Sequence, residues 1–137
     1  MTHHILRKAA LAHIKDRKLL MVRDFTRPEV FLTLGGKIEE GETDVECLHR
    51  EVLEEVGCKI EPGSVKFLGE FEAPAHNKPD VIVNIRLFAG ELASEPTPSS
   101  EVVELKYVDS SVEKKYLEGN IVGHQIVAWL KQHDLIN

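Results

Sequence analysis

The segment from Thr43 to Gly57 has the strongest helical signature in this 137-residue chain. Thr43 suits the N-cap position, and Glu46 three residues later completes a capping box that satisfies exposed backbone N–H groups. Gly57 stands where a residue in the left-handed conformation commonly ends a helix. These three residues predict a helix capped at both ends.

The predicted helix has an acidic arc beside an apolar stripe. At about 100° per residue, Glu51, Glu54 and Glu55 share an arc of about 100°. The neighbouring stripe is apolar and consists of Val45, Leu48, Val52 and Val56. Such a stripe can pack against a sheet. One side of the helix is therefore expected to be buried while the adjacent side holds three carboxylates.

The acidic arc has two interpretations. In a solvated helix, Glu46–Arg50 and Arg50–Glu54 pairs at i,i+4 spacing would each contribute a few tenths of a kcal/mol. Glu51 and Glu55 are like charges at the same spacing and oppose each other, and a divalent cation would remove that conflict. Oxygen ligands without a His or thiolate cluster favour Mg²⁺, or Mn²⁺ in its place.

Hydrophobic alternation and turn residues predict strands in the rest of the chain. The expected strands span 5–14, 18–23, 30–34, 65–73, 81–92 and 102–108. We expect loops where Gly35 and Gly36 follow the third of these strands, over 73–79, and over the proline-rich segment 95–100. A final amphipathic helix is expected over 121–135.

Composition indicates a globular chain, with 42% hydrophobic and 29% charged residues. Its length fits one domain over 1–137. The sequence has neither a secretory apolar core nor a run long enough to span a bilayer, so cytoplasm and no membrane partner are expected. A net charge of −6 argues against binding a nucleic acid polymer. Cys47 and Cys58 are expected to be buried free thiols.

The run from Gly36 to Cys58 resembles the Nudix box of the MutT-like hydrolases, G-x5-E-x7-R-E-U-x-E-E-x-G-U. All seven fixed letters match, at Gly36, Glu42, Arg50, Glu51, Glu54, Glu55 and Gly57. Two positions depart from the usual pattern. Cys58 replaces a larger aliphatic residue, and Leu34 stands where many members have proline before the paired glycines. Neither is a proposed ligand, so the departures concern packing and loop geometry.

The resemblance implies a fold, an activity and a ligand set. The fold would be α/β, a Nudix-type α/β/α sandwich with a mixed central β-sheet. The activity would be metal-dependent hydrolysis of a nucleoside diphosphate linked to another moiety, so the partner is a small nucleotide; a homodimer is compatible with the fold. Matching positions would make Glu51, Glu54 and Glu55 metal ligands, one of which would help to deprotonate water. Arg50 would orient these glutamates.

Other metal-site residues are implied more loosely. Glu42 would support the metal shell from the loop, and the carbonyl of Gly35 or Gly36 could approach the metal because no side chain obstructs it. Glu101, after the proline-rich loop, resembles the acidic residue that approaches the metals in MutT-like members and is a candidate ligand or base. The alternatives are Glu70, Glu72 and Asp80, or a merely solvated Glu101.

The sequence gives only weak indications of which residues would contact the substrate. Lys37 follows the glycines and could hold a phosphate or could be a solvated lysine. Arg23 is a further candidate from residues 1–40, where eight Lys and Arg side chains outnumber five acids and most are expected on a solvated face. Asn120 resembles a residue that binds oxidised purines, although a helix N-cap is the preferred interpretation.

Two further positions have simple structural interpretations. Pro74, sixteen residues beyond the box, resembles a feature of ADP-ribose-type members, but a turn proline is preferred. Trp129 could stack on a base, but its helical spacing favours packing in the core or in a dimer. The main alternative function is a catalytically weak Nudix-fold module that senses or binds a nucleotide.

Overall fold

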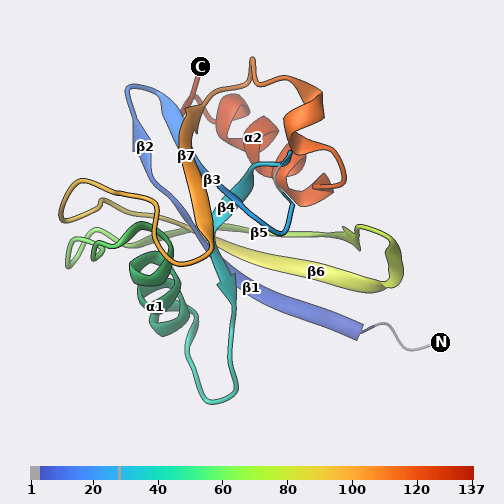
Figure 1. The fold of residues 1–137 in the computed structure, drawn as a ribbon, viewed down its shortest axis with the longest axis horizontal. Helices are drawn as coiled ribbons and strands as arrows, with labels where there is room; N and C mark the ends of the chain where they lie inside the picture. The colour runs from blue at the N-terminus through green and yellow to red at the C-terminus, as the bar shows by residue number, and fades with distance from the viewer. Residues whose placement is uncertain (1–3, 28) are drawn as a thin grey trace.

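A mixed β-sheet lies between helices α1 and α2 in the computed structural model, which describes residues 4–27 and 29–137 (Figure 1). The elements in chain order are β1 (His4–Ala12), β2 (Ile14–Lys15), β3 (Lys18–Asp24), β4 (Leu32–Lys37), α1 (Asp44–Val56), β5 (Lys66–Ala75), β6 (Lys78–Ala89), β7 (Val102–Val108), the 3-10 helix η1 (Lys114–Leu117) and α2 (Ile121–Gln132). This arrangement confirms the expected α/β/α sandwich. Positions 1–3 and 28 of the expected domain 1–137 lie outside the described residues.

Strand β1 is the strand on which both halves of the sheet depend. The pairing order is β2-β3-β4-β1-β6-β5, and β7 pairs with β3. β1 runs parallel to β6 and antiparallel to β4, whereas β5 is antiparallel to β6. The sheet is therefore mixed, and two segments far apart in sequence border the same central strand.

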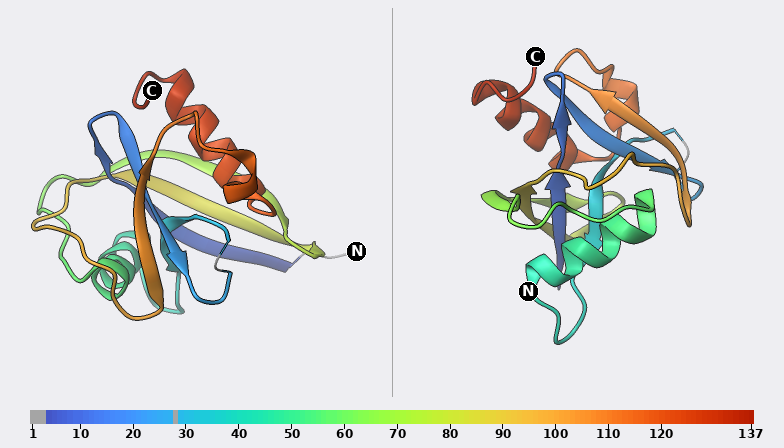
Figure 2. Two further views of the ribbon diagram at one scale, coloured as in Figure 1. Left: turned by 45° about the horizontal axis from the view of Figure 1, so that its top comes forward. Right: turned by 90° about the vertical axis from the view of Figure 1, so that its left-hand side faces the viewer.

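The last four side chains of β1, Ala9 to Ala12, are buried on both faces of the sheet. Ala9 and Leu11 belong to the core under α1, whereas Ala10 and Ala12 belong to the core under α2. This division follows from the alternation of side chains along a strand. The helix residues that cover the two faces are Leu48, Val52 and Val56 in α1 and Ile126, Val127 and Leu130 in α2. Figure 2 shows the two helices on opposite sides of the sheet.

Helix α1 has the predicted caps. The Glu46 backbone N–H donates to Thr43 Oγ1 at 3.1 Å, and the Thr43 backbone N–H donates to Glu46 Oε1 at 2.9 Å. Gly57 ends the helix with φ of 68°. The predicted apolar stripe was wrong at one position: Val45 is 38% exposed, and Cys47 is buried in its place. Cys47 and Cys58 are buried free thiols, as expected.

Other boundaries differ from the sequence-based expectations. β4 begins at Leu32 and continues through Gly35 and Gly36, which pair with β1 and do not form a loop. The expected loop over 73–79 shrinks to a turn at His76-Asn77, where Asn77 has φ of 59°. α2 ends at Gln132, and η1 was not anticipated. Segment 95–100 is irregular, as predicted.

Within residues 4–27 and 29–137, no helix is both long and apolar enough to cross a bilayer.

Replacement of Thr43 by Ala should lower the free energy of unfolding by about 1 kcal/mol, because a backbone N–H of α1 loses its acceptor. Urea denaturation of the wild type, Thr43→Ala, Glu46→Ala and the double variant measures the effect. The two hydrogen bonds are reciprocal, so the losses of the two single variants should sum to more than the loss of the double variant. Strict additivity would contradict the capping-box interpretation.

Candidate active site

Arg50 connects the loop before α1 with the carboxylates of the helix. Its Nε and Nη2 atoms donate to the two carboxylate oxygens of Glu42 at 2.8 and 3.0 Å. Nη1 donates to Glu51 Oε1 at 2.7 Å and lies 3.6 Å from Glu54 Oε1. Nη2 also donates to the Lys37 carbonyl at 3.0 Å. One planar guanidinium therefore holds β4, the loop and α1 together.

The pairing with Arg50 strongly favours the ionised form of Glu42. Hydrogen bonds from Arg50 lower the pKa of Glu42 to about 2, and the backbone N–H of Glu39 adds to this effect. Both oxygens of Glu42 are already used by these donors. Glu42 thus acts in this structure as the carboxylate that positions Arg50.

Gly35 and Gly36 allow α1 to approach the sheet closely. A Cβ atom at position 36 would lie 2.6 Å from Glu51 Oε2, so a side chain there would displace this carboxylate. The Gly35 N–H donates to Glu55 Oε1 at 2.9 Å. Gly35 has φ of 145°, and a Cβ atom there would overlap the Ala9 carbonyl. The glycine pair therefore forms a cradle for two of the three helix carboxylates.

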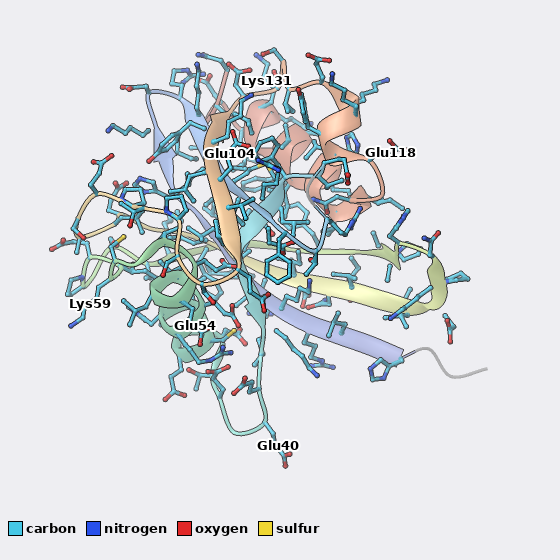
Figure 3. The ribbon with its side chains drawn as sticks, viewed as in Figure 1. Glu40, Glu54, Lys59, Glu104, Glu118 and Lys131 are labelled. Carbon is cyan, nitrogen blue, oxygen red and sulfur yellow. The ribbon has the colours of Figure 1, made fainter. Side chains whose placement is uncertain are left out.

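The three carboxylates of the acidic arc have different environments. Burial raises the pKa of Glu55 to about 8, although the hydrogen bond from Gly35 opposes this shift. Burial also raises the pKa of Glu51, against the opposing effect of Arg50. Glu54 is the outer member, with a side chain 53% exposed (Figure 3). Two carboxylates are thus desolvated next to one that faces solvent.

The donor set suits a hard cation, although the side chains do not already converge on one point. Across the described residues, no three His, Cys, Asp or Glu side chains have an arrangement that could hold a metal ion. Glu51 and Glu54 lie near Arg50, while Glu55 is bonded to Gly35. The cradle at Gly36 and the desolvated oxygens fit Mg²⁺, which prefers oxygen ligands.

The carbonyl oxygen of Gly36 already accepts a weak hydrogen bond. The Cys47 thiol lies 3.4 Å from both the Gly36 and the Lys37 carbonyl oxygens and donates to them. Burial raises the pKa of Cys47 to about 11, which keeps it a thiol and a donor. If the Gly36 carbonyl oxygen bound a cation, it would do so while accepting the hydrogen bond from the Cys47 thiol.

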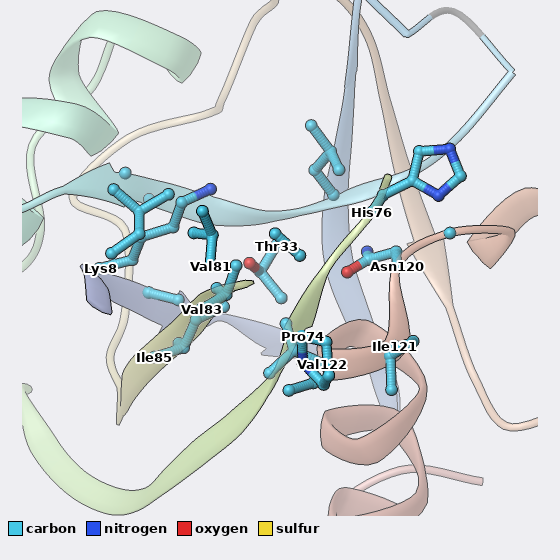
Figure 4. A pocket seen from close by; sticks show the side chains of 18 of the residues that line it. Lys8, Thr33, Pro74, His76, Val81, Val83, Ile85, Asn120, Ile121 and Val122 are labelled. Carbon is cyan, nitrogen blue, oxygen red and sulfur yellow. The ribbon is translucent and has the colours of Figure 1, made fainter. Parts of the chain in front are cut away.

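A cavity of about 550 Å³ opens beside the carboxylates. Gly35, Gly36 and Glu55 line one end of it, and Figure 4 shows Asn120 and His76 at the opposite end from Lys8. Its walls are largely aliphatic and include Leu6, Leu32, Pro74, Val81, Val83, Ile85, Ile121 and Val122. The cavity therefore joins an acidic end to an apolar chamber with polar groups at its far end.

Of the three predicted substrate-binding residues, one lines the cavity and two do not. Asn120 lines the cavity, but its amide donates to the Phe31 carbonyl at 3.0 Å and accepts from the Gly123 N–H at 3.1 Å. The N-cap interpretation is confirmed. Lys37 and Arg23 do not line this cavity, and Arg23 Nε donates to Glu104 Oε1 at 2.7 Å.

The candidate acids outside the helix are also dispersed. The Ser99 N–H donates to the Glu55 carbonyl at 3.0 Å, which brings the loop before Glu101 to the end of α1. The exposed Glu101 accepts from the Phe25 N–H through its main chain. Glu70 and Glu72 both accept from Asn84 Nδ2 and lie outside the cavity, as does the exposed Asp80. The loop before Glu101 therefore meets the C-terminal end of α1, whereas Glu70 is linked through Arg86 to Asp44 at its N-terminal end.

The turn-proline prediction for Pro74 was wrong, whereas the packing prediction for Trp129 is confirmed. Pro74 lies in β5, paired with Ile82 of β6, and contributes to the aliphatic wall of the cavity. Trp129 stacks on His133 with ring centroids 3.8 Å apart and packs edge-on against Phe71. It lies outside the cavity lining.

Several cavity residues were missed by the sequence analysis. Lys8, Asp24, Arg27 and His76 all line the cavity. Arg27 Nη2 donates to the Glu118 carbonyl at 2.9 Å, and His76 lies against Gly119 on the same segment. The sequence feature that could have identified one of them is the charge of Lys8, which directly precedes the buried run of β1.

A model of the NUDIX domain matches residues 5–130. This chain belongs to the NUDIX domain family. The segment that resembles the family's box is the acidic helix with its glycine cradle.

Relatives and solved structures agree with this membership. The NAD-capped RNA hydrolase NudC of Chromobacterium violaceum is 45% identical over 47 residues, which are 34% of this chain and 18% of that protein. The chain therefore matches under a fifth of this curated relative.

Two solved structures show how widely the fold is shared. The MutT protein from Methanosarcina mazei Go1 has a TM-score of 0.75 at 17% identity, covering 98% of both chains. A UDP-X diphosphatase has a TM-score of 0.77 at 19% identity, covering 98% of this chain and 66% of the other. At these identities the likeness concerns the fold.

Replacement of Arg50 by Lys should raise the pKa of Glu42 from about 2 toward 4.5 and lower the urea midpoint. A lysine ammonium cannot reproduce the two-pronged contact with the carboxylate. NMR titration of the Glu42 carboxyl carbon measures the shift. Arg7→Lys is the control. Arg7 is an exposed residue of β1, so its replacement should leave the pKa of Glu42 unchanged. An unshifted Glu42 in Arg50→Lys would contradict the assigned role of Arg50.

The metal-free protein should lose stability as pH rises from 4.5 to about 8. Glu55 has its raised pKa only in the folded state, so the folded protein retains a proton that the unfolded chain releases. Urea denaturation in EDTA across this range should show a smaller decline for Glu55→Gln than for the wild type. Glu40→Gln, which changes an exposed loop carboxylate, should retain the wild-type decline. Equal declines in all three proteins would refute the assignment.

Proposed function

We propose that this protein is a Mg²⁺-dependent hydrolase that cleaves a pyrophosphate bond in a nucleoside diphosphate derivative. The observation that carries the proposal is the position of Glu51 and Glu55, both desolvated on the glycine cradle at one end of a 550 Å³ cavity. Desolvated carboxylates are costly without a cation. A cavity at the same place supplies room for the substrate.

Each residue of the box has a role in this proposal. Glu51, Glu54 and Glu55 hold the cation, and Mn²⁺ can replace Mg²⁺ because both accept oxygen ligands. Glu42 keeps Arg50 in place, and Arg50 in turn orients Glu51. Glu54 is the most exposed of the three and is our candidate for accepting the proton of the attacking water.

The bound cation supplies charge neutralisation at the phosphate oxygens and a more acidic water. Glu101 is a second candidate base, since its loop is tied to the end of α1 by the Ser99–Glu55 hydrogen bond. Lys37 and Arg23 are proposed to contact the outer part of the polyphosphate. Both lie outside the cavity that would receive the nucleoside.

The cavity supports a nucleoside triphosphate or an ADP-ribose-like compound as substrate. Its volume is in the range of small-molecule sites and suits one nucleoside with its phosphates. The apolar walls can enclose a base, but no Phe, Tyr or Trp is among the described lining residues. Base selection would therefore rest on shape and on the polar groups near Asn120, whose amide is already engaged.

A nucleotide-sensing module is the second candidate function. It would use the same cavity but would bind its nucleotide without hydrolysing it. The glutamates and Arg50 of the box, together with their mutual contacts, favour the enzyme, because a binding module needs no proton acceptor beside the cation.

The decisive experiment is a hydrolysis panel with Mg²⁺ or EDTA. It contains dNTPs, oxidised dGTP, ADP-ribose, dinucleoside polyphosphates and nucleotide sugars, with products resolved by chromatography. We expect Mg²⁺-dependent cleavage of at least one compound, and Glu54→Gln should reduce its kcat by roughly 10²-fold or more because the proton acceptor is lost. Glu40→Gln should retain wild-type activity. Binding without turnover across the panel would favour the sensing module, and turnover in EDTA would contradict the metal site.

A further inference from the structure

Lys8 places a charged side chain inside the cavity near its acidic end. It belongs to β1, where it lies opposite Ile85 of β6 in the parallel register. Alternation along β1 puts Leu6, Lys8 and Ala10 on one face, and all three line the cavity. Figure 4 shows Lys8 beside Val83 and Ile85, at the opposite end from Asn120 and His76.

The lysine has no short-range partner in the part of the chain that the structure describes. No hydrogen bond, and no ion pair within 4.0 Å, joins its ammonium to residues 4–27 or 29–137. The charged groups that face it are Glu55 and Glu51 from α1, Asp24 from β3, and Arg27 from the following segment. An ammonium that is largely removed from water yet unbonded retains three donors for a ligand.

The position of Lys8 in the cavity indicates which part of the substrate it would contact. The carboxylates of α1 mark the end where the cation and the scissile pyrophosphate bind, and the aliphatic walls mark the chamber for the nucleoside. A group between these two regions meets the phosphate that is bonded to the nucleoside 5′-oxygen. A lysine ammonium is a compact charge suited to a phosphate oxygen.

We propose that Lys8 binds the nucleoside-linked phosphate of the substrate and thereby makes this cavity selective for nucleotides over nucleosides. This inference rests on the proposed function, because it places the nucleoside in the same cavity. It assigns to Lys8 a binding role and no proton transfer.

A different role for Lys8 would be purely structural. Its charge could serve to offset the negative field of Glu51 and Glu55 when no cation is bound. In that case, removal of the charge would alter stability and cation binding. It would not alter the affinity difference between a nucleotide and its nucleoside, which depends on a contact to phosphate.

Calorimetric titration of products separates the two roles without requiring turnover. The probes are AMP, GMP, CMP and UMP, each compared with its own nucleoside in Mg²⁺. The proteins are the wild type, Lys8→Met, Lys8→Arg and Arg7→Met. Arg7 is the matched control because it is the neighbouring cation of β1 and points to the opposite face, outside the cavity.

The wild type should bind at least one monophosphate more tightly than its nucleoside, by roughly 10- to 100-fold for a charge-assisted contact. Lys8→Met should abolish this margin and leave the affinity for the nucleoside unchanged. Lys8→Arg should retain part of the margin, and Arg7→Met should retain all of it. If Lys8→Met does not fold, Lys8→Gln is titrated in its place.

Three outcomes would overturn the proposal. They are a wild type without any phosphate-dependent margin, a margin that survives the loss of the lysine, and an equal loss of affinity for nucleotide and nucleoside. Each is distinct from failure of the proposed function. That failure appears as absent hydrolysis in the panel, whereas monophosphate binding can be measured in an enzyme or in a sensing module.

Discussion

The guanidinium of Arg50 is the contact on which the geometry of the site depends. Its bonds to Glu42, to the Lys37 carbonyl and to Glu51 connect the end of β4, the following loop and α1. The apolar stripe of α1 fixes the helix on the sheet, and Ile38 ties the start of the preceding loop to β1 and to the same core. Arg50 adds an anchor for the rest of this loop from the polar side of the helix. Loop and carboxylates are therefore held in one arrangement before a ligand arrives.

The glycine pair determines how near the carboxylates come to the sheet. Glu51 and Glu55 approach the backbone of β4 closely and lose much of their contact with solvent, and their pKa values rise as a result. Like charges at helical spacing and desolvated acids both oppose stability. Local rules that favour folding are often broken where function requires it. The conflict has a natural solution in a bound cation, which is why the site supports the chemistry proposed for it.

Local features were predicted well, and features that depend on packing were not. The caps of α1 depend on residues three positions apart, so Thr43, Glu46 and Gly57 were sufficient to locate the helix ends. The choice between Val45 and Cys47 as the buried residue depends on the angle at which α1 meets the sheet. Gly35 and Gly36 were expected in a loop because glycine commonly ends a strand, whereas pairing with β1 continues β4 through them.

The sequence by itself determined the family, the mixed α/β/α architecture implied by the box, and the carboxylates that share one face of α1. These follow from short-range spacing, which the chain specifies directly. Only the tertiary structure decided that Lys8 lines the cavity, that the amide of Asn120 is engaged, and that Lys37 lies outside. The physical reason is that the cavity is assembled from β1, β4, β5, β6 and the start of α2, segments joined by pairings between residues far apart along the chain. Which side chains share that space depends on strand order and register, and neither is encoded in any one segment.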